Sequence, residues 1–439
     1  MQSIEPVLAE GAEAVTAVLD AGLADALGAE RAARWRVERA GYRPTAHMLG
    51  SGAGILAAVL TSGRPATAAT KIVDLWTSPE APTDAADRLI AGVIAAAAER
   101  GDAAVKWELP EDAAVPASAA ALGFAPLRAP WGAVGTEATQ GLVHWLIPLT
   151  HDEPGYYGQT TLFTCGAVAA LIATERHGSP GFGGETVPDR DLEIDFWRRA
   201  SNYPACEPLG LAVTVQEHVG SRGAVEVALD HPGPVLLEDF TGFDYDFRAE
   251  LQRESRKRAA DLGIPVDTAR IPMTDVAARV AAGEQALLLI DEAPMHADPG
   301  PHWIVAHAAA GPYVVVEDPW VNQATGETWV DTHDLPIHID DLALAETADT
   351  FRDEREGRTA RVDQAIAAAQ QIHVPKSLIS VLNRIGACGV LVGGHPLIGQ
   401  PLLGHDDIAV LCDEVTLHLS IVGGQKDLSA RMPREQLTQ

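Results

Sequence analysis

The chain has 439 residues, of which 47% are hydrophobic and 21% charged, and its formal net charge is -29. This composition is typical of a globular protein, and the length predicts two or three domains. The acidic charge argues against nucleic acid and anionic membranes as partners, because both would repel it.

The first residues are acidic and carry no basic flank before an apolar stretch, so they lack the pattern of a signal peptide. The four cysteines are far apart and form neither a paired metal motif nor a disulfide framework. They are Cys165, Cys206, Cys388 and Cys412. We therefore expect a cytoplasmic protein with reduced thiols.

Apolar residues recur at helical spacing within residues 1–40, which predicts a helical lead-in. The pattern then changes to that of an α/β domain. It predicts, in order, a hairpin about 50–54, a strand at 69–80, a helix at 84–101, a strand at 103–111, a short helix and a last strand at 141–149.

This order, together with ALGFAPL at 121–127, resembles the acetyltransferase fold of the GNAT superfamily. The resemblance implies a coenzyme A pyrophosphate bound by a Gly-rich turn at the N-terminus of the central helix. Here the turn reads SPEAPTDAADRL, at 78–89, with carboxylates and no glycine. We therefore expect a GNAT-like domain that has lost acetyl transfer, with active acetyl transfer as a minor alternative.

A linker at 149–158 precedes a second domain. Its pattern predicts helices on either side of a Gly/Pro-rich loop at 177–191, and a charged helix at 243–263. A strand at 286–292 and a hairpin at 302–320, turning at Ala310-Gly311, follow.

Cys165 opens an Ala-rich helix, and a helix N-terminus favours the thiolate that a cysteine nucleophile needs. Taken alone, such a cysteine is more often buried and inert. The 302–320 hairpin brings Asp318 within one residue of the register of His302, so that Asp318 accepts the Nδ1 proton of a basic imidazole. Gln159, in the loop before Cys165, provides an amide that can donate to an oxyanion.

Three segments resemble the peptidase C39-like family of cysteine peptidases, in the branch fused behind GNAT domains. They read GQTTLFTCGAVAAL, LEIDFWRRASNYPACEPLGLAV and HWIVAHAAAGPYVVVEDPW. The resemblance implies a papain-like site with Cys165 as nucleophile, His302 as base, Asp318 as orienter and Gln159 as oxyanion donor. Ala167 replaces the proline that the family usually has after Cys-Gly.

Other residues have weaker assignments. We expect Gly166, Trp303 and Cys206 at the substrate site, with Cys206 more often structural in such a position. His307 is expected to share a strand face with Trp303 and to be partly buried, with the hydrogen bonds of its ring nitrogens satisfied. Two further sets are candidates: Glu193, Asp195 and Trp197 for a pocket, and His395 with His405, Asp406 and Asp407 for a metal. The structural interpretation is favoured for both, so we expect no metal and no cofactor.

These patterns predict an α+β protein: a helical lead-in and degenerate GNAT-like α/β domain at 1–148, a papain-like C39-type cysteine peptidase domain at 149–371 and a C-terminal extension at 372–439. The expected function is a cysteine-dependent peptidase or amidase that forms a Cys165 acyl-enzyme. Acyl or peptidyl transfer in natural-product biosynthesis, and a non-catalytic scaffold, are the alternatives. The expected partner is a peptide or amide-type small molecule, free or carrier-bound.

Overall fold

The computed structural model describes residues 5–39, 41–51, 54–136, 138–296 and 300–345. They belong to the first of two units, Met1–Thr347 and Ala348–Gln439. The predicted 372–439 extension, two of the cysteines and the candidate metal group lie outside the described residues. They are Cys388, Cys412, His395 and 405–407. Among the described helices, none has the length and apolarity that crossing a bilayer requires.

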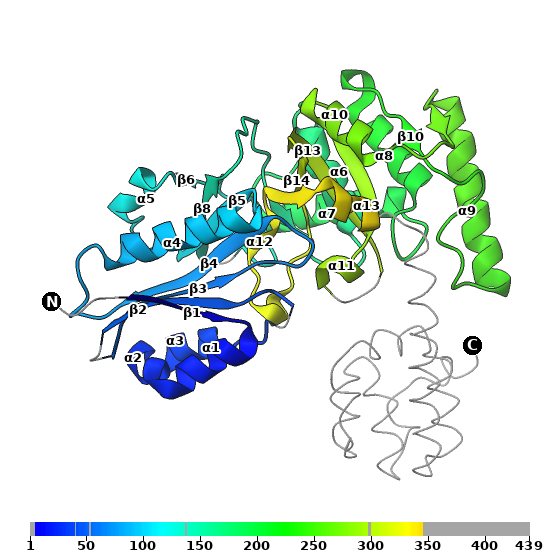
Figure 1. Cartoon of the computed structure of the whole chain (residues 1–439). Coiled ribbons are helices and arrows are strands. Elements are labelled where there is room, and N and C mark those ends of the chain that lie inside the picture. Colours follow the sequence, from blue (N-terminus) through cyan, green and yellow to red (C-terminus); the bar gives the residue numbers. More distant parts are fainter. Residues whose placement is uncertain (1–4, 40, 52–53, 137, 297–299, 346–439) are drawn as a thin grey trace, which may run out of the picture. The chain divides into compact units, whose positions relative to one another are not determined.

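A seven-stranded sheet forms the N-terminal part, in the order β1-β2-β3-β4-β5-β8-β6 (Figure 1). Neighbouring strands are antiparallel except β4 and β5, which pair in parallel from Ala69/Ala104 to Ile72/Trp107. The strands are β1 (Glu5–Glu10), β2 (Thr45–Ser51), β3 (Gly54–Ser62), β4 (Ala69–Thr77), β5 (Ala104–Pro110), β6 (Ala125–Pro126) and β8 (Thr139–Trp145). The predicted GNAT-like order is thus confirmed.

Helices cover both faces of this sheet (Figure 1). Helix α4 (Ala85–Arg100) packs on one face, and α1 (Ala12–Val18), the π-helical turn η1 (Leu19–Leu23), α2 (Ala24–Leu27) and α3 (Ala29–Trp35) pack on the other. Gly101 ends α4 in the left-handed conformation, as a C-terminal glycine commonly does. A short helix, α5 (Ala117–Ala121), precedes β6.

The helical lead-in prediction was wrong at its start. Residues Glu5–Glu10 form β1, which pairs antiparallel with β2 along its whole length. Val7 and Leu8, which fitted a helical repeat, are about half exposed. They lie on a sheet edge where the backbone hydrogen bonds, rather than apolar burial, hold the strand.

The second sheet is antiparallel, in the order β12-β13-β14-β15. Alternation along its strands separates two cores. Trp303 and Val305 pack against α6, whereas Ile304 and Ala306 face α10 and α13. The strands are β12 (Ala286–Asp291), β13 (Pro301–Ala310), β14 (Tyr313–Glu317) and β15 (Leu335–His338).

Helices surround this second sheet. They are α6 (Cys165–Glu175), α7 (Thr186–Ala200), α8 (Pro208–Val219), α9 (Gly242–Asp261), α10 (Met273–Ala281), α11 (Ala293–His296) and α13 (Ile339–Ala345). Short strands β7 (Gly132–Ala133), β9 (Tyr157–Gly158), β10 (Val227–Ala228) and β11 (Val266–Asp267), with turns η2 (Gly220–Arg222) and η3 (Gln323–Thr325), complete the described elements. The α+β class is confirmed.

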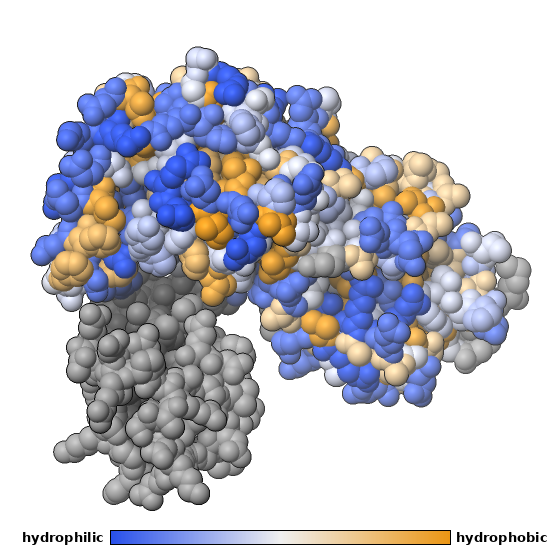
Figure 2. All heavy atoms as spheres, turned by 180° about the vertical axis from the view of Figure 1, so that it is seen from behind, coloured by the Kyte–Doolittle hydropathy of each residue, from blue (hydrophilic) through white to orange (hydrophobic). Residues whose placement is uncertain are grey.

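The two sheets belong to one packed unit. Helix α12 (Trp329–Thr332) contacts β5 and β8 of the first sheet. Trp329 and Val330 form a buried cluster with Ala104, Leu127 and Val143. The surface is largely hydrophilic on the face in Figure 2, with hydrophobic side chains gathered in separate patches. Side chains of both predicted domains therefore share a core.

Candidate active site

Cys165 is the first residue of α6, and only 4% of its surface is exposed. Every residue of α6 from Cys165 to Thr174 is buried, so this helix is packed on all sides. The first backbone N–H groups of a helix have no partner within it. The N-terminal end of α6 therefore presents N–H donors beside the thiol.

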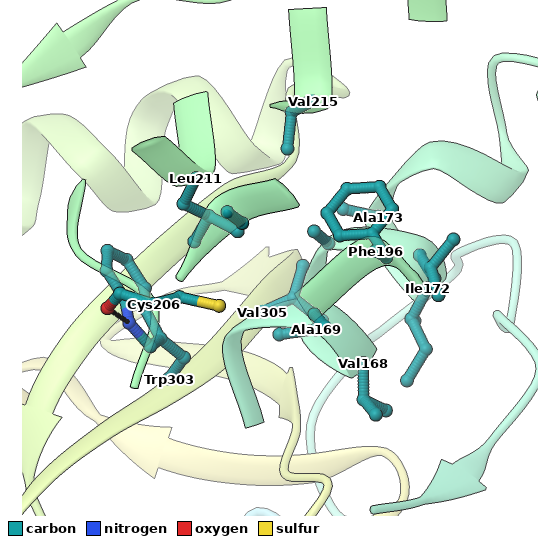
Figure 3. Packing of buried hydrophobic residues seen from close by; sticks show 14 of the residues in the cluster. Val168, Ala169, Ile172, Ala173, Phe196, Cys206, Leu211, Val215, Trp303 and Val305 are labelled. Carbon is teal, nitrogen blue, oxygen red and sulfur yellow. Dashed lines mark hydrogen bonds between the residues drawn. The ribbon is translucent and has the colours of Figure 1, made fainter. Parts of the chain in front are cut away.

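Gly166 is required by the packing behind Cys165. A Cβ at this position would lie 2.9 Å from Cys206 Cβ and 2.9 Å from Trp303 Cδ1. The Trp303 indole donates to the Cys206 carbonyl at 3.1 Å, and both residues are buried (Figure 3). The three residues thus form the wall that supports the first turn of α6, and their part in substrate binding stays a prediction.

The loop before Cys165 is fixed by one buried carboxylate. Glu193, on α7, is fully buried and accepts hydrogen bonds from the Thr160 amide at 2.8 Å and the Thr160 hydroxyl at 2.7 Å. The Thr164 hydroxyl donates to the same carboxylate at 2.5 Å. Glu193, a pocket candidate in the sequence, therefore anchors the loop that carries Gln159.

Gln159 lies in this loop and is 4% exposed. Its side-chain amide donates to the Thr161 carbonyl at 2.8 Å, and its backbone amide donates to the Pro319 carbonyl at 2.9 Å. The second bond ties the loop to the residue that follows Asp318. Because an amide nitrogen carries two hydrogens, one N–H of Gln159 remains for another acceptor.

His302 lies near the start of β13 and is 3% exposed. Its Nε2 lies 2.7 Å from Asp318 Oδ1, and its Nδ1 lies 3.0 Å from Glu292 Oε1. The Cys165 thiol lies close enough to His302 to contribute to raising the pKa of the imidazole. Asp318 contacts Nε2 and Glu292 contacts Nδ1. The prediction that Asp318 would accept from Nδ1 was wrong.

The register of the hairpin explains how Asp318 reaches His302. Val305 pairs with Glu317, and a bulge between Ala306 and Ala308 shifts the pairing. Continued by three residues, this register places His302 opposite position 320, two residues beyond Asp318. The last observed pair is Val305 with Glu317, so no observed pair tests the predicted offset of one residue, and the continued register gives two. An offset of two residues leaves both side chains on one face of the sheet, whereas an offset of one would separate them.

Asp318 is held from the N-terminal part of the chain. Arg64, in the loop between β3 and β4, donates to Asp318 Oδ2 at 2.6 Å, and both side chains are 1% exposed. The same guanidinium lies 2.9 Å from Glu327. The Trp320 amide donates to Asp318 Oδ1 at 2.8 Å. The carboxylate that contacts His302 thus has a fixed orientation.

These contacts set the charges of the site. Burial alone would lower the pKa of His302, but the carboxylates of Glu292 and Asp318 and the Cys165 thiol raise that pKa well above its usual value. Burial alone would raise the pKa of Asp318, but Arg64 and then His302 hold it below its usual range. The arrangement therefore favours an imidazolium beside the thiol.

Residues 154–352 match the family model described as "Peptidase_C39 like family". Over this segment the chain is similar to that family, and we refer to the segment as the C39-like domain. The C39-like domain contains Cys165, Gln159, His302 and Asp318, and the match indicates enzymatic activity.

Solved acetyltransferase structures are similar to the N-terminal region. The ribosomal-protein-S18-alanine N-acetyltransferase of Escherichia coli is 13% identical, with 36% of this chain and 100% of that chain covered and a TM-score of 0.24. The acyl-CoA N-acyltransferase of Klebsiella pneumoniae is 13% identical, with 33% of this chain and 98% of that chain covered and a TM-score of 0.23. A Bacillus subtilis acetyltransferase in complex with CoA is 12% identical, with 33% of this chain and 100% of that chain covered and a TM-score of 0.22. No curated protein matches the chain.

Two residues at the site of the C39-like domain were missed from the sequence. Glu292 follows β12 and reaches His302 from the next strand of the sheet. The register of β12 and β13, with Ile290 opposite His302, was the only signal that could have indicated it. Arg64 lies 254 residues before Asp318, and no local pattern connects them.

His307 also departs from the prediction. It lies at the bulge in β13 and is fully buried, but neither ring nitrogen makes a hydrogen bond. Its Nε2 lies 3.1 Å from Glu317 Oε1 and 3.3 Å from Asp334 Oδ1 without the alignment of a hydrogen bond. The bulge interrupts the regular alternation of β13 at His307, so the prediction that His307 shares a face with Trp303 stays a prediction.

Proposed function

We propose that the protein is a cysteine-dependent hydrolase of peptide or amide bonds, with Cys165 as nucleophile, His302 as general base and acid, and Asp318 as the group that orients His302. The observation that carries the proposal is the connected set of contacts from Cys165 to His302 and from His302 Nε2 to Asp318, 2.7 Å apart. A nucleophile in contact with a base, and a base held by a third group, is the geometry of nucleophilic acyl transfer.

In the first step the Cys165 thiolate attacks the substrate carbonyl carbon, and the carbon–oxygen π electrons move to the oxygen. The backbone N–H of Cys165 and the free N–H of Gln159 are the proposed donors to this oxyanion. As the intermediate collapses, the carbon–nitrogen bond breaks and His302 gives its Nδ1 proton to the leaving amine. The product is a thioester on Cys165.

In the second step His302, now neutral, accepts a proton from water while the water oxygen attacks the thioester. The carbon–sulfur bond breaks, and the acid leaves as the thiolate and imidazolium are restored. An amine in place of water would give acyl transfer through the same intermediate.

The proposed C39-like domain extends over 149–371. It follows a GNAT-like domain at 1–148 that does not transfer acetyl groups, and residues 372–439 form a proposed extension.

Intact-mass spectrometry tests the proposal without a known substrate. Wild type and Cys165→Ala are incubated with panels of peptides, amides and peptidyl thioesters, free and carrier-bound, and quenched in acid. We expect a mass increase equal to one acyl group in wild type and none in Cys165→Ala. Cys206→Ala is the matched control, because Cys206 is the other buried free thiol of the described residues.

The alternatives make different predictions. A scaffold protein would form no adduct with any panel, and its thiol would react with iodoacetamide only as pH approaches the value for a free thiol, about 8.5. That pair of results would overturn the proposed function. Adducts that disappear only when an amine is added would assign a transferase in place of a hydrolase.

A further inference from the structure

A second group of titratable side chains lies where the linker after β8 crosses the sheet of the C39-like domain. Its members come from the linker, from β13 and β14, and from the turn between α12 and β15. They are His151, Glu153, His307, Glu317, His333 and Asp334. We call this group the junction cluster. None of its members takes part in the proposed reaction.

Three ligand atoms of the junction cluster converge. One atom each from His151, His307 and Asp334 lies within 4.8 Å of the other two. His151 Nε2 lies 2.9 Å and His307 Nε2 lies 3.3 Å from Asp334 Oδ1. A tetrahedral zinc ion with bonds of about 2.0–2.1 Å would hold its ligand atoms roughly 3.4 Å apart. The separation of His307 Nε2 from Asp334 Oδ1 is close to that value, and the separation of His151 Nε2 from the same oxygen is shorter, at a hydrogen-bond distance.

The burial of His307 and the lack of hydrogen bonds at its ring nitrogens indicate that this side chain binds a ligand. Its side chain is 0% exposed, and neither of its ring nitrogens has a hydrogen-bond partner. Nε2 nevertheless lies close to two carboxylates, Asp334 and Glu317. When an imidazole nitrogen and a carboxylate oxygen bind the same cation, they lie close together without being aligned for a hydrogen bond. His307 and its neighbouring carboxylates have this arrangement. A buried, unpartnered imidazole is otherwise costly.

A second triad, of Glu153, His333 and Asp334, has similar spacing, but the hydrogen bonding of its histidine differs from that of His307. His333 Nδ1 lies 2.7 Å from Glu317 and Nε2 lies 2.8 Å from Glu153, so both ring nitrogens are already hydrogen-bonded. His333 is therefore the outer partner that holds Glu317. Outer hydrogen bonds of this kind orient the groups around a metal. In the first triad His151 Nε2 forms a hydrogen bond with Asp334 at 2.9 Å, which a cation would replace, whereas His307 has no hydrogen bond to lose.

Charge favours a cation at the same place. Glu317 and Asp334 are buried carboxylates with exposures of 0% and 1%. The nearby Lys106 ammonium donates to the His333 carbonyl at 2.5 Å rather than to Glu317 or Asp334, and its charge acts on both carboxylates from there. A divalent cation bound by two imidazoles and a carboxylate would compensate the remaining charge.

We propose that the junction cluster binds one divalent transition-metal ion, with zinc the best chemical fit, through His151 Nε2, His307 Nε2 and Asp334 Oδ1. Glu317, beside His307, is the neighbouring carboxylate, and water is the fourth ligand. Because His151 belongs to the linker, His307 to β13 and Asp334 to the turn before β15, the ion fastens the linker to the C39-like domain. The site is separate from the proposed reaction at Cys165.

The test uses the full chain carrying Cys165→Ala, so that the thiol beside His302 cannot be the metal ligand. The chelator-treated protein is titrated with Zn²⁺, and bound metal is counted by mass spectrometry after desalting. Co²⁺ then reports tetrahedral coordination by its visible absorption. We expect one ion per chain, a rise in melting temperature on adding Zn²⁺, and loss of both in His307→Gln. His338→Gln, at a partly exposed histidine of β15, should bind as the parent does.

If His307→Gln fails to fold, His151→Gln provides the same comparison at a more exposed ligand, with 12% of the side chain accessible. Failure of the parent to bind Zn²⁺ overturns the proposal. Equal binding by the parent and by both ligand variants also overturns it, as does a Co²⁺ spectrum dominated by thiolate charge transfer.

Discussion

At the scale of single residues, His302 is held by a carboxylate on each ring nitrogen. Asp318 contacts Nε2, and Glu292 contacts Nδ1. Glu292 is 20% exposed at its side chain, whereas Asp318 is buried. In the proposed reaction, proton transfer at Nδ1 requires Glu292 to release the imidazole, and Glu292 is the more exposed of the two carboxylates.

Glu292→Gln is expected to lower the pKa of His302, because a carboxylate that favours the imidazolium is removed. An opposite charge at this distance shifts a pKa by roughly 1–3 units. Stability supplied by a raised histidine pKa is complete below the unfolded value of about 6.5 and is lost as pH rises through the folded pKa. In the variant the loss should still begin near the unfolded value, but it should be smaller and complete at lower pH, because the folded pKa is lower.

The measurement is an NMR titration of ¹³C-labelled histidine, with the His302 signal assigned by its absence in His302→Gln. Glu284→Gln is the control, because Glu284 is half exposed and pairs with Arg279 at the surface. An unchanged His302 titration in Glu292→Gln would show that Glu292 does not interact with the charged imidazole in solution.

At the scale of elements, the loop before Cys165 depends on α7. Glu193→Ala removes the acceptor of three hydrogen bonds from this loop, including one from a backbone amide. We expect the free energy of unfolding to fall by about 1–3 kcal/mol, since buried donors are left unsatisfied. The acyl-adduct yield should fall with it, because the same loop carries Gln159.

Asp195→Ala on the same helix is the matched control. Asp195 is 66% exposed and its ion pair with Arg199 is an exposed i,i+4 contact, for which a change of less than about 1 kcal/mol is expected. Urea unfolding of both variants provides the comparison. A Glu193→Ala protein as stable as Asp195→Ala would contradict the anchoring role.

The sequence was informative where a local pattern determines the structure. The helix at 84–101 was predicted because its apolar period, its starting Asp84 and its ending Gly101 agree, and α4 follows these bounds closely. The 302–320 hairpin was predicted from its turn. The bulge at His307 was not, because a bulge adds one residue without changing the apolar character of a buried strand.

The candidate site was predictable in part. The placement of Cys165 and the proximity of His302 and Asp318 follow from a helix start and one hairpin, both local features. Which nitrogen faces which group depends on the register, which the sequence alone does not determine. Arg64 could not be predicted, because its contacts arise only when two distant parts of the chain pack together.

At the scale of the whole molecule, buried ion pairs connect the two sheets. Arg64 contacts Asp318 and Glu327, and Lys71 on β4 contacts Asp331 on α12, with side chains at most 5% exposed in each pair. Buried charges keep their partners because an unpaired one is costly to leave away from water. The N-terminal part of the chain thus helps to build the site around Cys165.

Arg64→Met is expected to reduce the free energy of unfolding by about 3–5 kcal/mol, since Asp318 and Glu327 lose their buried cation. The acyl-adduct yield should fall in the same variant, because Asp318 is no longer fixed. Arg36→Met is the control: Arg36 forms an exposed pair with Asp20, worth less than about 1 kcal/mol. Urea unfolding and intact-mass trapping measure both effects, and wild-type values in Arg64→Met would refute the dependence.

The Arg64–Asp318 contact also bears on how the protein is made. Arg64 leaves the ribosome 254 residues before Asp318, which at about 5–20 residues per second is a delay on the order of ten seconds to a minute. During that interval the guanidinium has neither Asp318 nor Glu327, and Cys165 has already been synthesised without an oriented imidazole. If Cys165 acts as proposed, the order of translation keeps unfinished chains inactive.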